Sequence, residues 1–290
     1  MIYLTLSVLS SVVIFIVFKL FGGFKINTLH AIVVNYIVAF TCGIIAYDSP
    51  IHFSEVINNG WFYYSLGLGA LFILVFNLMA LTTQRSGLSV VSVATKMSVV
   101  IPICFGLVYY KESLDAYKTI GIVLALIAVY LTSIKSSNGL IIQKRDLLFP
   151  FLVFVGSGII DTSIKFLEGA YVNKDDIAIF SATIFGSAAI VGLLFISIQA
   201  IRNSFTITLK SVIGGIALGV PNYFSIYFLV KALRSDLLDS SGIFTVNNVG
   251  VVMISTLLGI LLFKEKLIAK NWFGILLAVL SIVLIMFSRL

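Results

Sequence analysis

The chain has 290 residues, of which 60% are hydrophobic and only 11% are charged, against about 25% charged residues in an average soluble domain. A chain of this length has too little interior to bury so much apolar side chain, so the composition excludes an ordinary water-soluble domain and makes lipid the solvent for most of the surface. The net charge of +7 comes from Lys and Arg residues scattered between apolar segments. That pattern excludes a nucleic-acid-binding surface and is typical of membrane interfaces.

Ten apolar segments follow one another, each long enough for a helix to cross the hydrocarbon core at 1.5 Å per residue. The first segment has no basic region before it and no small-residue cleavage site after it, so we expect a retained transmembrane helix and not a signal peptide. The connectors leave no room for a soluble domain. The expected helices cover residues 2–20, 28–47, 61–83, 88–109, 117–134, 147–167, 177–200, 209–232, 239–263 and 269–287.

The sequence repeats itself at a constant offset of 153 residues. Residues 103–131 align with 256–284 without a gap, and ten of the 29 pairs are identical, including Lys111-Glu112 with Lys264-Glu265. Apolar composition does not explain a repeated Lys-Glu pair. We therefore predict an all-α integral membrane protein made of two five-helix repeats, 1–138 and 145–290. Because each repeat has an odd number of crossings, the second is inverted, which places a substrate site near the bilayer midplane between the halves.

Lys96 is the most informative residue, because it lies about 12 Å inside the fourth expected helix. A cation at that depth costs about 2.5 to 3.5 kcal/mol by insertion scales. Ser92 and Thr95 share its helical face. We predict that these three residues line a central cavity and bind the substrate.

The ninth expected helix carries a second polar stripe with Thr245, Asn247 and Asn248. The offset of 153 places Thr245 on Ser92 and Asn248 on Thr95, so we predict that both stripes face one cavity. The alternative is that these hydroxyl and amide groups only join helices through hydrogen bonds.

Two prolines are expected to interrupt helices, Pro102 in the fourth and Pro221 in the eighth. A broken helix can offer backbone groups to a ligand, so Asn222 and Tyr223 join the predicted substrate site. Asn77, a single amide in the third helix, is also a candidate. Kinks and amides that serve packing alone are the alternative for all of them.

Asp161 in the sixth expected helix has three candidate roles. Its spacing of four from Lys165 is that of an ion pair within one helix, and this is the role we favour. It is otherwise a counter-ion for Lys96 or the carrier of a coupling proton or ion.

The sequence contains no sign of a metal, a cofactor or an enzyme. Cys42 and Cys104 lie inside apolar segments and are expected to pack there, and no spacing typical of metal ligands occurs. There is no Walker motif, so we do not expect ATP hydrolysis in this chain. We expect no catalytic residues, because no nucleophile–base constellation is present.

The repeated signature resembles that of the drug/metabolite transporter superfamily, in its EamA-like ten-helix branch. It reads Tyr110-Lys111-Glu112-Ser113-Leu114 with Gly121, and again Phe263-Lys264-Glu265-Lys266-Leu267 with Gly274. The resemblance implies a multi-pass protein of the cell membrane, a monomer or homodimer, that moves small metabolites, often amino acids, by alternating access. The first helix departs from the branch: it has Ser10-Ser11 in place of Trp-Gly-Ser and no acidic residue, which argues against a multidrug cation pump.

One buried cation among hydroxyls and amides favours a substrate with a carboxylate or phosphate, such as an amino acid. A lipid-carrier flippase on the same fold and an accessory membrane subunit without an open pathway are the alternatives. The expected partners are therefore a small-molecule substrate and the lipid bilayer.

The orientation in the membrane has two conflicting indications. The related transporters usually keep both termini in the cytoplasm. Of the Lys and Arg residues near helix ends, six lie on the side of the termini and eleven on the other side, and basic residues favour the cytoplasmic side. The six are Lys111, Lys118, Lys174, Lys231, Arg234 and Arg289, and the eleven are Lys19, Lys25, Arg85, Lys135, Lys144, Arg145, Arg202, Lys210, Lys264, Lys266 and Lys270.

The count of basic residues predicts that both termini are outside. In a chain whose Cys42 and Cys104 are replaced by Ser, a single cysteine at Asp175 should react with an impermeant maleimide in intact cells. A cysteine at Ser137 should react only after permeabilisation. The reverse pattern would place the termini in the cytoplasm and show that the basic residues do not set the orientation.

Overall fold

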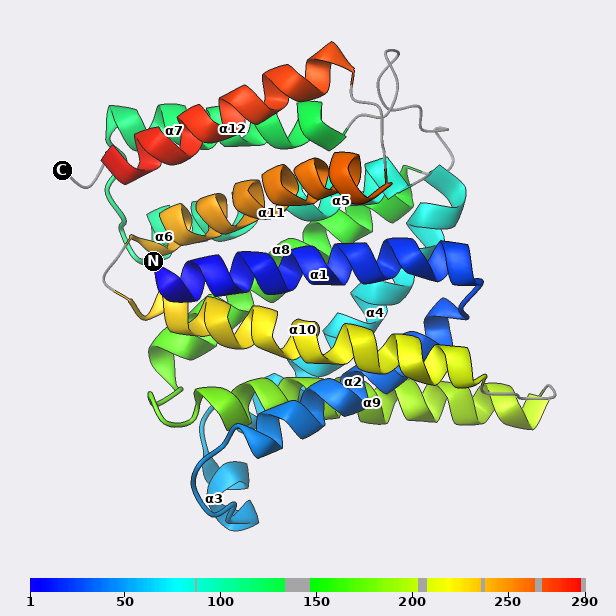
Figure 1. Cartoon of the computed structure of the whole chain (residues 1–290). Coiled ribbons are helices and arrows are strands. Elements are labelled where there is room, and N and C mark those ends of the chain that lie inside the picture. Colours follow the sequence, from blue (N-terminus) through cyan, green and yellow to red (C-terminus); the bar gives the residue numbers. More distant parts are fainter. Residues whose placement is uncertain (87, 134–146, 203–207, 236–237, 264–267, 288–290) are drawn as a thin grey trace.

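The computed structural model describes residues 1–86, 88–133, 147–202, 208–235, 238–263 and 268–287. These residues form α-helices and short connections, and no strand occurs among them, which confirms the predicted all-α class. Figure 1 shows the helices lying roughly along one common direction, with the start of the first and the end of the last at the same end of the bundle. The helices are α1 (Ile2–Phe24), α2 (Thr28–Ile45), α3 (Phe53–Asn58), α4 (Phe62–Ser86), α5 (Leu88–Met97), α6 (Val100–Tyr109), α7 (Ala116–Ser133), α8 (Leu148–Ala170), α9 (Ile177–Arg202), α10 (Leu209–Leu233), α11 (Ser240–Phe263) and α12 (Ala269–Phe287).

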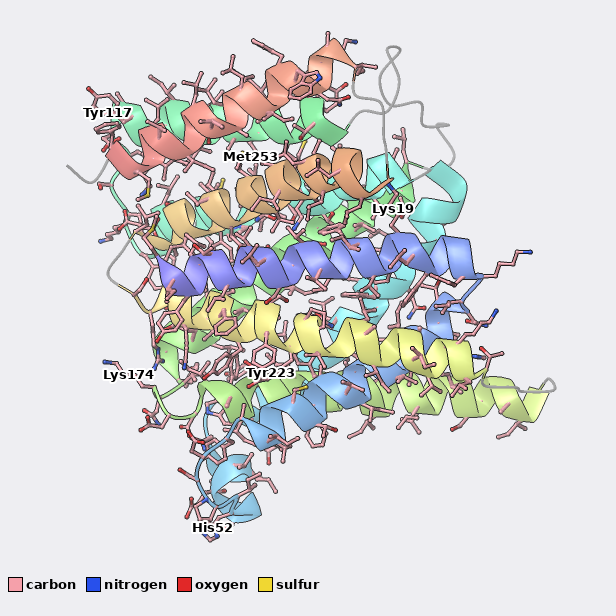
Figure 2. The ribbon with its side chains drawn as sticks, viewed as in Figure 1. Lys19, His52, Tyr117, Lys174, Tyr223 and Met253 are labelled. Atoms are coloured by element: carbon pink, nitrogen blue, oxygen red, sulfur yellow. The ribbon has the colours of Figure 1, made fainter. Side chains whose placement is uncertain are left out.

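Ten crossings of a bilayer follow from these helices. Eight of them, α1, α2, α4 and α8 to α12, are long and apolar enough to cross by themselves. The fourth crossing is divided into α5 and α6, and the fifth is α7, both apolar. Figure 2 shows Lys174 at the end of the bundle that carries the chain termini and Lys19 toward the opposite end.

The fourth crossing breaks between Met97 and Val100, close to the predicted Pro102. Proline has no N–H, so the carbonyl of Ser98 loses its helical donor. The N–H of Ile101 takes this carbonyl instead, at 2.9 Å. The matching prediction for the eighth crossing is wrong, because α10 runs through Pro221 without interruption from Leu209 to Leu233.

Several of the main helix contacts recur when the two halves are exchanged. In the first half α1 packs on α10 and α11, and in the second half α8 packs on α4 and on α5 and α6. The pair α7 and α12 shows the symmetry at single residues: a Cβ on Gly121 would lie 2.7 Å from Ile285, and a Cβ on Gly274 would lie 2.9 Å from Thr132. The offset of 153 converts one contact into the other. Figure 1 shows α7 and α12 running in opposite directions, as an inverted repeat requires. The predicted limits of the repeats at 138 and 145 fall outside the described residues.

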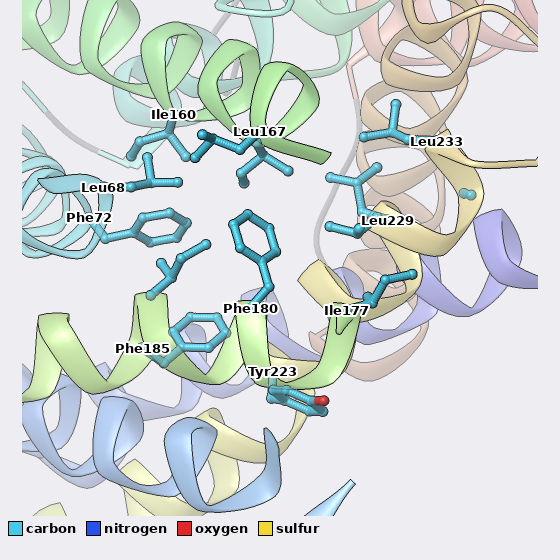
Figure 3. Packing of buried hydrophobic residues seen from close by; sticks show 14 of the residues in the cluster. Leu68, Phe72, Ile160, Leu167, Ile177, Phe180, Phe185, Tyr223, Leu229 and Leu233 are labelled. Carbon is cyan, nitrogen blue, oxygen red and sulfur yellow. The ribbon is translucent and has the colours of Figure 1, made fainter. Parts of the chain in front are cut away.

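A core of aromatic and aliphatic side chains joins α2, α4, α8, α9 and α10 (Figure 3). Tyr36, Phe180, Phe185 and Tyr223 are fully buried there. The ring of Tyr223 stacks on Tyr227 at 5.6 Å and meets Phe185 edge-on at 6.5 Å. Phe185 of α9 also contacts Tyr36 of α2 at 6.2 Å and Phe72 of α4 at 5.9 Å, so its ring joins the seventh crossing to the second, third and eighth.

Close helix crossings in this core rely on glycine. A Cβ on Gly69 of α4 would lie 2.4 Å from the carbonyl oxygen of Ile184 in α9, and a Cβ on Gly215 of α10 would lie 2.8 Å from the carbonyl oxygen of Ala31 in α2. Within a membrane, such small residues let helix backbones approach and gain packing contacts. Gly67, two residues before Gly69, has nothing within 4 Å of its Cβ position.

We predict that Gly69→Ala destabilises the chain and Gly67→Ala does not. The new methyl of Gly69→Ala overlaps backbone of α9, and overpacking of this kind costs about 1 to 3 kcal/mol. In Gly67→Ala the methyl enters open space, and alanine favours a helix over glycine. Thermal unfolding in detergent measures both, and equal melting temperatures of the two variants would contradict the close crossing.

Candidate functional site

Lys96 lies in the last turn of α5, immediately before the break in the fourth crossing. The unpaired carbonyls at the C-terminal end of a helix favour a cation. The ammonium group lies 5.2 Å from the centre of the Phe15 ring in α1, within the range of a cation–π contact. The break in the helix and the aromatic ring therefore both stabilise a charge that hydrocarbon would reject.

Asp161 of α8 is the acidic residue whose charge acts on Lys96, and the two interact electrostatically. Both side chains are half-buried. The helices can meet here because Gly158 lies one turn before Asp161, and a Cβ on it would lie 2.3 Å from Ile101 at the start of α6. The arrangement places one positive and one negative group together in the interior of the bundle.

The favoured pairing of Asp161 with Lys165 is wrong. Lys165 Nζ lies 3.0 Å from Glu168 Oε2, one helical turn along α8. Arg234 at the end of α10 holds the other oxygen of Glu168 through its Nε at 2.7 Å. Residues three or four positions apart can both meet on one face of a helix, so Lys165 could reach either Asp161 or Glu168. It pairs with Glu168, a buried carboxylate that Arg234 also contacts.

Two of the other predicted substrate residues, Asn247 and Asn222, contact polar groups of other helices. The hydroxyl of Ser7 in α1 contacts Asn247 Oδ1 at 3.0 Å, about 12 Å along α1 from Phe15 at 1.5 Å per residue. Asn222 Nδ2 donates to Asn35 Oδ1 at 3.0 Å and joins α10 to α2. Both amides therefore join helices through hydrogen bonds, which was the alternative to a role in substrate binding.

Four further candidates hydrogen-bond within their own helix. Thr95, Asn77, Thr245 and Asn248 donate to the carbonyls of Val91, Ile73, Ser241 and Phe244 respectively. After such a bond each threonine hydroxyl can still accept a hydrogen bond, and each asparagine amide keeps a second N–H and its oxygen for another partner. Tyr223 lies in the hydrophobic core, in the interior of the bundle as Figure 2 shows. Ser92 lies within α5, and its side chain is outside the described part of the structure.

A carboxylate joins helices at the end of the bundle that carries the chain termini. Glu112, just after α6, accepts hydrogen bonds from the backbone N–H groups of Ser240 and Ser241 at 3.1 and 3.2 Å and from both hydroxyls. These are the first residues of α11, so Glu112 caps its N-terminus. Lys118 of α7 lies 3.5 Å from Glu112 and 2.8 Å from Asp239.

The same end carries the Glu168–Arg234 pair, so two buried carboxylates join five crossings there: the fourth, fifth and ninth through Glu112, and the sixth and eighth through Glu168. Tyr110 lies beside both, with the Lys165 ammonium 5.5 Å from its ring centre. Burial, followed by the negative charge of Glu168, raises the pKa of Tyr110, so its phenol stays protonated at neutral pH.

Sequence reasoning missed Phe15 and Arg234 and left the role of Glu112 open. Phe15 is one of 24 phenylalanines, and no pattern marks it as a partner of Lys96. The repeated Lys-Glu pair was the available signal for Glu112, but its partners come from the other half of the chain.

Comparison with known proteins agrees with this architecture. The sequence profile of the EamA-like transporter family matches residues 1–134. An uncharacterized protein of Haemophilus influenzae is 31% identical over 290 residues, which covers 96% of this chain and 95% of that protein. A crystal structure of another protein superposes with a TM-score of 0.78 at 12% identity, over 99% of this chain and 96% of that one, and shows that the two share a fold.

The chain therefore belongs to the EamA-like transporter family, within the drug/metabolite transporter superfamily. It is a multi-pass membrane protein. The family confirms the resemblance drawn from the repeated signature.

We predict that Glu112→Gln destabilises the chain by about 1.5 to 3 kcal/mol, the usual worth of hydrogen bonds to a charged group. The amide accepts through one oxygen only and turns its N–H₂ group toward the donors of α11. Thermal unfolding in detergent measures the loss. Glu55→Gln is the matched control, because Glu55 is exposed in the short helix α3 and should leave the melting temperature unchanged. An equal effect of the two substitutions would contradict the capping role.

Proposed function

We propose that this protein is a secondary transporter that moves a small solute bearing a carboxylate or phosphate group, with amino acids as the first candidates. The observation that carries the proposal is Lys96, a cation held in the bilayer interior beside Asp161 and above the Phe15 ring. Membership of a transporter family supports the class of activity. The charge of Lys96 supports the class of solute.

Lys96 is the proposed binding group for the substrate anion. An ammonium in a medium of low dielectric attracts an anion far more strongly than it does in water. Lys96 also lies beside the break in the fourth crossing, and discontinuous helices form substrate and ion sites in many transporters. Ser92, Thr95, Thr245 and Asn248 are the proposed neutral groups of the same cavity, with Asn77, Asn222, Tyr223 and Asn247 at a greater distance.

Asp161 is the proposed coupling residue. In the absence of substrate it neutralises Lys96. When a substrate anion pairs with Lys96, one cation faces two anions, and an uncompensated buried carboxylate is costly. We propose that Asp161 then takes up a proton, so that the anion and the proton move together.

Alternating access requires each end of the cavity to open in turn. The contacts of Glu112 with α11 and of Glu168 with Arg234 are the proposed closure at the end that carries the termini. In the proposed cycle these contacts separate when that end opens. The pseudo-symmetry of the two halves supports a matching closure at the opposite end.

Two substitutions test the roles of the charged pair. We expect Lys96→Met to abolish transport because it removes the binding charge, although it makes insertion into the membrane easier. We expect Asp161→Asn to transport slowly and to lose its response to a pH gradient, because the amide cannot carry a proton. The measurement is efflux from proteoliposomes loaded with a defined mixture of amino acids and sugar phosphates, with and without a pH gradient, read by mass spectrometry.

The double variant Lys96→Met/Asp161→Asn is the control for folding. Each single variant leaves one buried charge without its partner, and the double variant leaves none, so its thermal stability should exceed that of both single variants. It should still fail to transport. Full transport by Lys96→Met would show that the lysine is structural, and no flux of any solute with the unmodified chain would favour an accessory role.

A further inference from the structure

A crevice separate from the charged pair opens between α4, α6 and α8. Its volume is about 470 Å³, and its walls include Tyr64, Gly67, Phe105, Tyr109, Ser163 and Phe166. Tyr64 and Tyr109 are exposed at its rim. All of these residues belong to the half of the bundle that carries the chain termini, at the start of α4 and the ends of α6 and α8.

The crevice faces away from the proposed transport site. At 100° per residue, the crevice residues Thr162, Ser163, Phe166 and Leu167 point in a mean direction about 170° around α8 from Asp161. The crevice therefore lies on the outer side of α8, toward the bilayer, while Asp161 lies on the inner side with Lys96.

The chemistry of the walls suits hydrocarbon. None of the lining residues is charged, and the hydroxyl of Thr162 already donates to the carbonyl of Gly158 at 2.7 Å. Water needs two to four polar partners to occupy a cavity. Apart from Thr162, the walls offer the hydroxyls of Ser163, Tyr64 and Tyr109, and the rest of the lining is apolar. An empty crevice would leave the aromatic rings without dispersion contacts on one side. A polar metabolite would lose its hydration there without compensation.

The shape of the crevice selects the kind of apolar occupant. The ring of Phe105 stacks on Tyr109 at 4.9 Å, and Phe166 meets Tyr109 edge-on at 5.7 Å, which makes a continuous aromatic wall. On the other side Gly67 has nothing within 4 Å of its Cβ position. A helix 10 Å wide fills roughly 420 Å³ in a single turn, so the crevice has room for little more than one turn of a partner helix. A single unbranched hydrocarbon chain is a better match for this volume.

We propose that this crevice is a binding site for one acyl chain of a phospholipid, in the leaflet on the side of the chain termini. The chain lies between the aromatic wall of α6 and α8 and the gap left by Gly67 in α4. The tyrosines at the rim lie toward the headgroup level, where such side chains are favoured.

Photolabelling tests the site on the full chain. The chain is reconstituted in vesicles of phosphatidylethanolamine and phosphatidylglycerol that contain a trace of phosphatidylethanolamine with a diazirine in the middle of one acyl chain. After illumination, labelled residues are mapped by mass spectrometry. We expect labelling of the crevice residues to exceed that of Leu193 and Leu194, which are exposed on the lipid-facing side of α9.

Filling the crevice separates a bound chain from bulk lipid. Gly67→Phe places a ring in the open space, and the excess labelling at Phe105 and Phe166 should fall to the level of α9. Gly22→Phe is the matched control, because Gly22 of α1 also has nothing within 4 Å of its Cβ position, and it should keep the excess. Ser163→Leu fills the crevice from the opposite wall and should lower the labelling in the same way. It provides a second test in case Gly67→Phe does not fold.

Two results would overturn the proposal. The first is labelling of the crevice in the unmodified chain no stronger than that of α9, which would mean bulk lipid only. The second is excess labelling that persists in a folded Gly67→Phe or Ser163→Leu variant. Neither readout depends on transport, so the proposal stands or falls separately from the proposed function.

Discussion

The low dielectric of the bilayer interior is the constraint on which the rest of this structure depends. A charge placed there must find compensation from the protein, because neither water nor lipid supplies it. Lys96 finds three sources of compensation: the carboxylate of Asp161, the face of Phe15 and the carbonyl end of α5. Each of them comes from a different helix or from a break in a helix, so the charge requires a specific packing of the fourth crossing against the first and sixth.

The same constraint explains the buried carboxylates at the end of the bundle that carries the termini. Glu112 and Glu168 are almost fully buried, and each is surrounded by donors from other helices. Removal of one partner of such a carboxylate lowers the stability of the protein by more than the net contribution of the intact interaction, because it leaves a buried charge without compensation. If this end opens in the proposed transport cycle, these contacts must be replaced by others or by water.

Tight crossings and loose ones have separate roles in the bundle. Gly69 and Gly158 bring backbones and side chains into close contact, and they hold the core and the charged pair in place. Gly67, in the same helix as Gly69, leaves space at the lipid-facing surface. Small residues in one membrane helix thus differ in role: Gly69 permits a close helix crossing, and Gly67 lines the crevice proposed to bind lipid.

The sequence by itself determined the class, the crossings and the duplication, because these depend on local properties. Segment length and hydropathy are set by the thickness of the bilayer, the constant offset of 153 is read directly, and the effect of Pro102 follows from its missing N–H. Only the tertiary structure decided which polar groups meet. The spacing on α8 allowed Lys165 to pair with Asp161, but Lys165 pairs with Glu168, which Arg234, distant in sequence, also contacts. Asn222 and Asn247 found partners on other helices, and Phe15 met Lys96 although nothing marks it. Partners of this kind are fixed by how the helices cross, and periodicity within one helix carries no information about that.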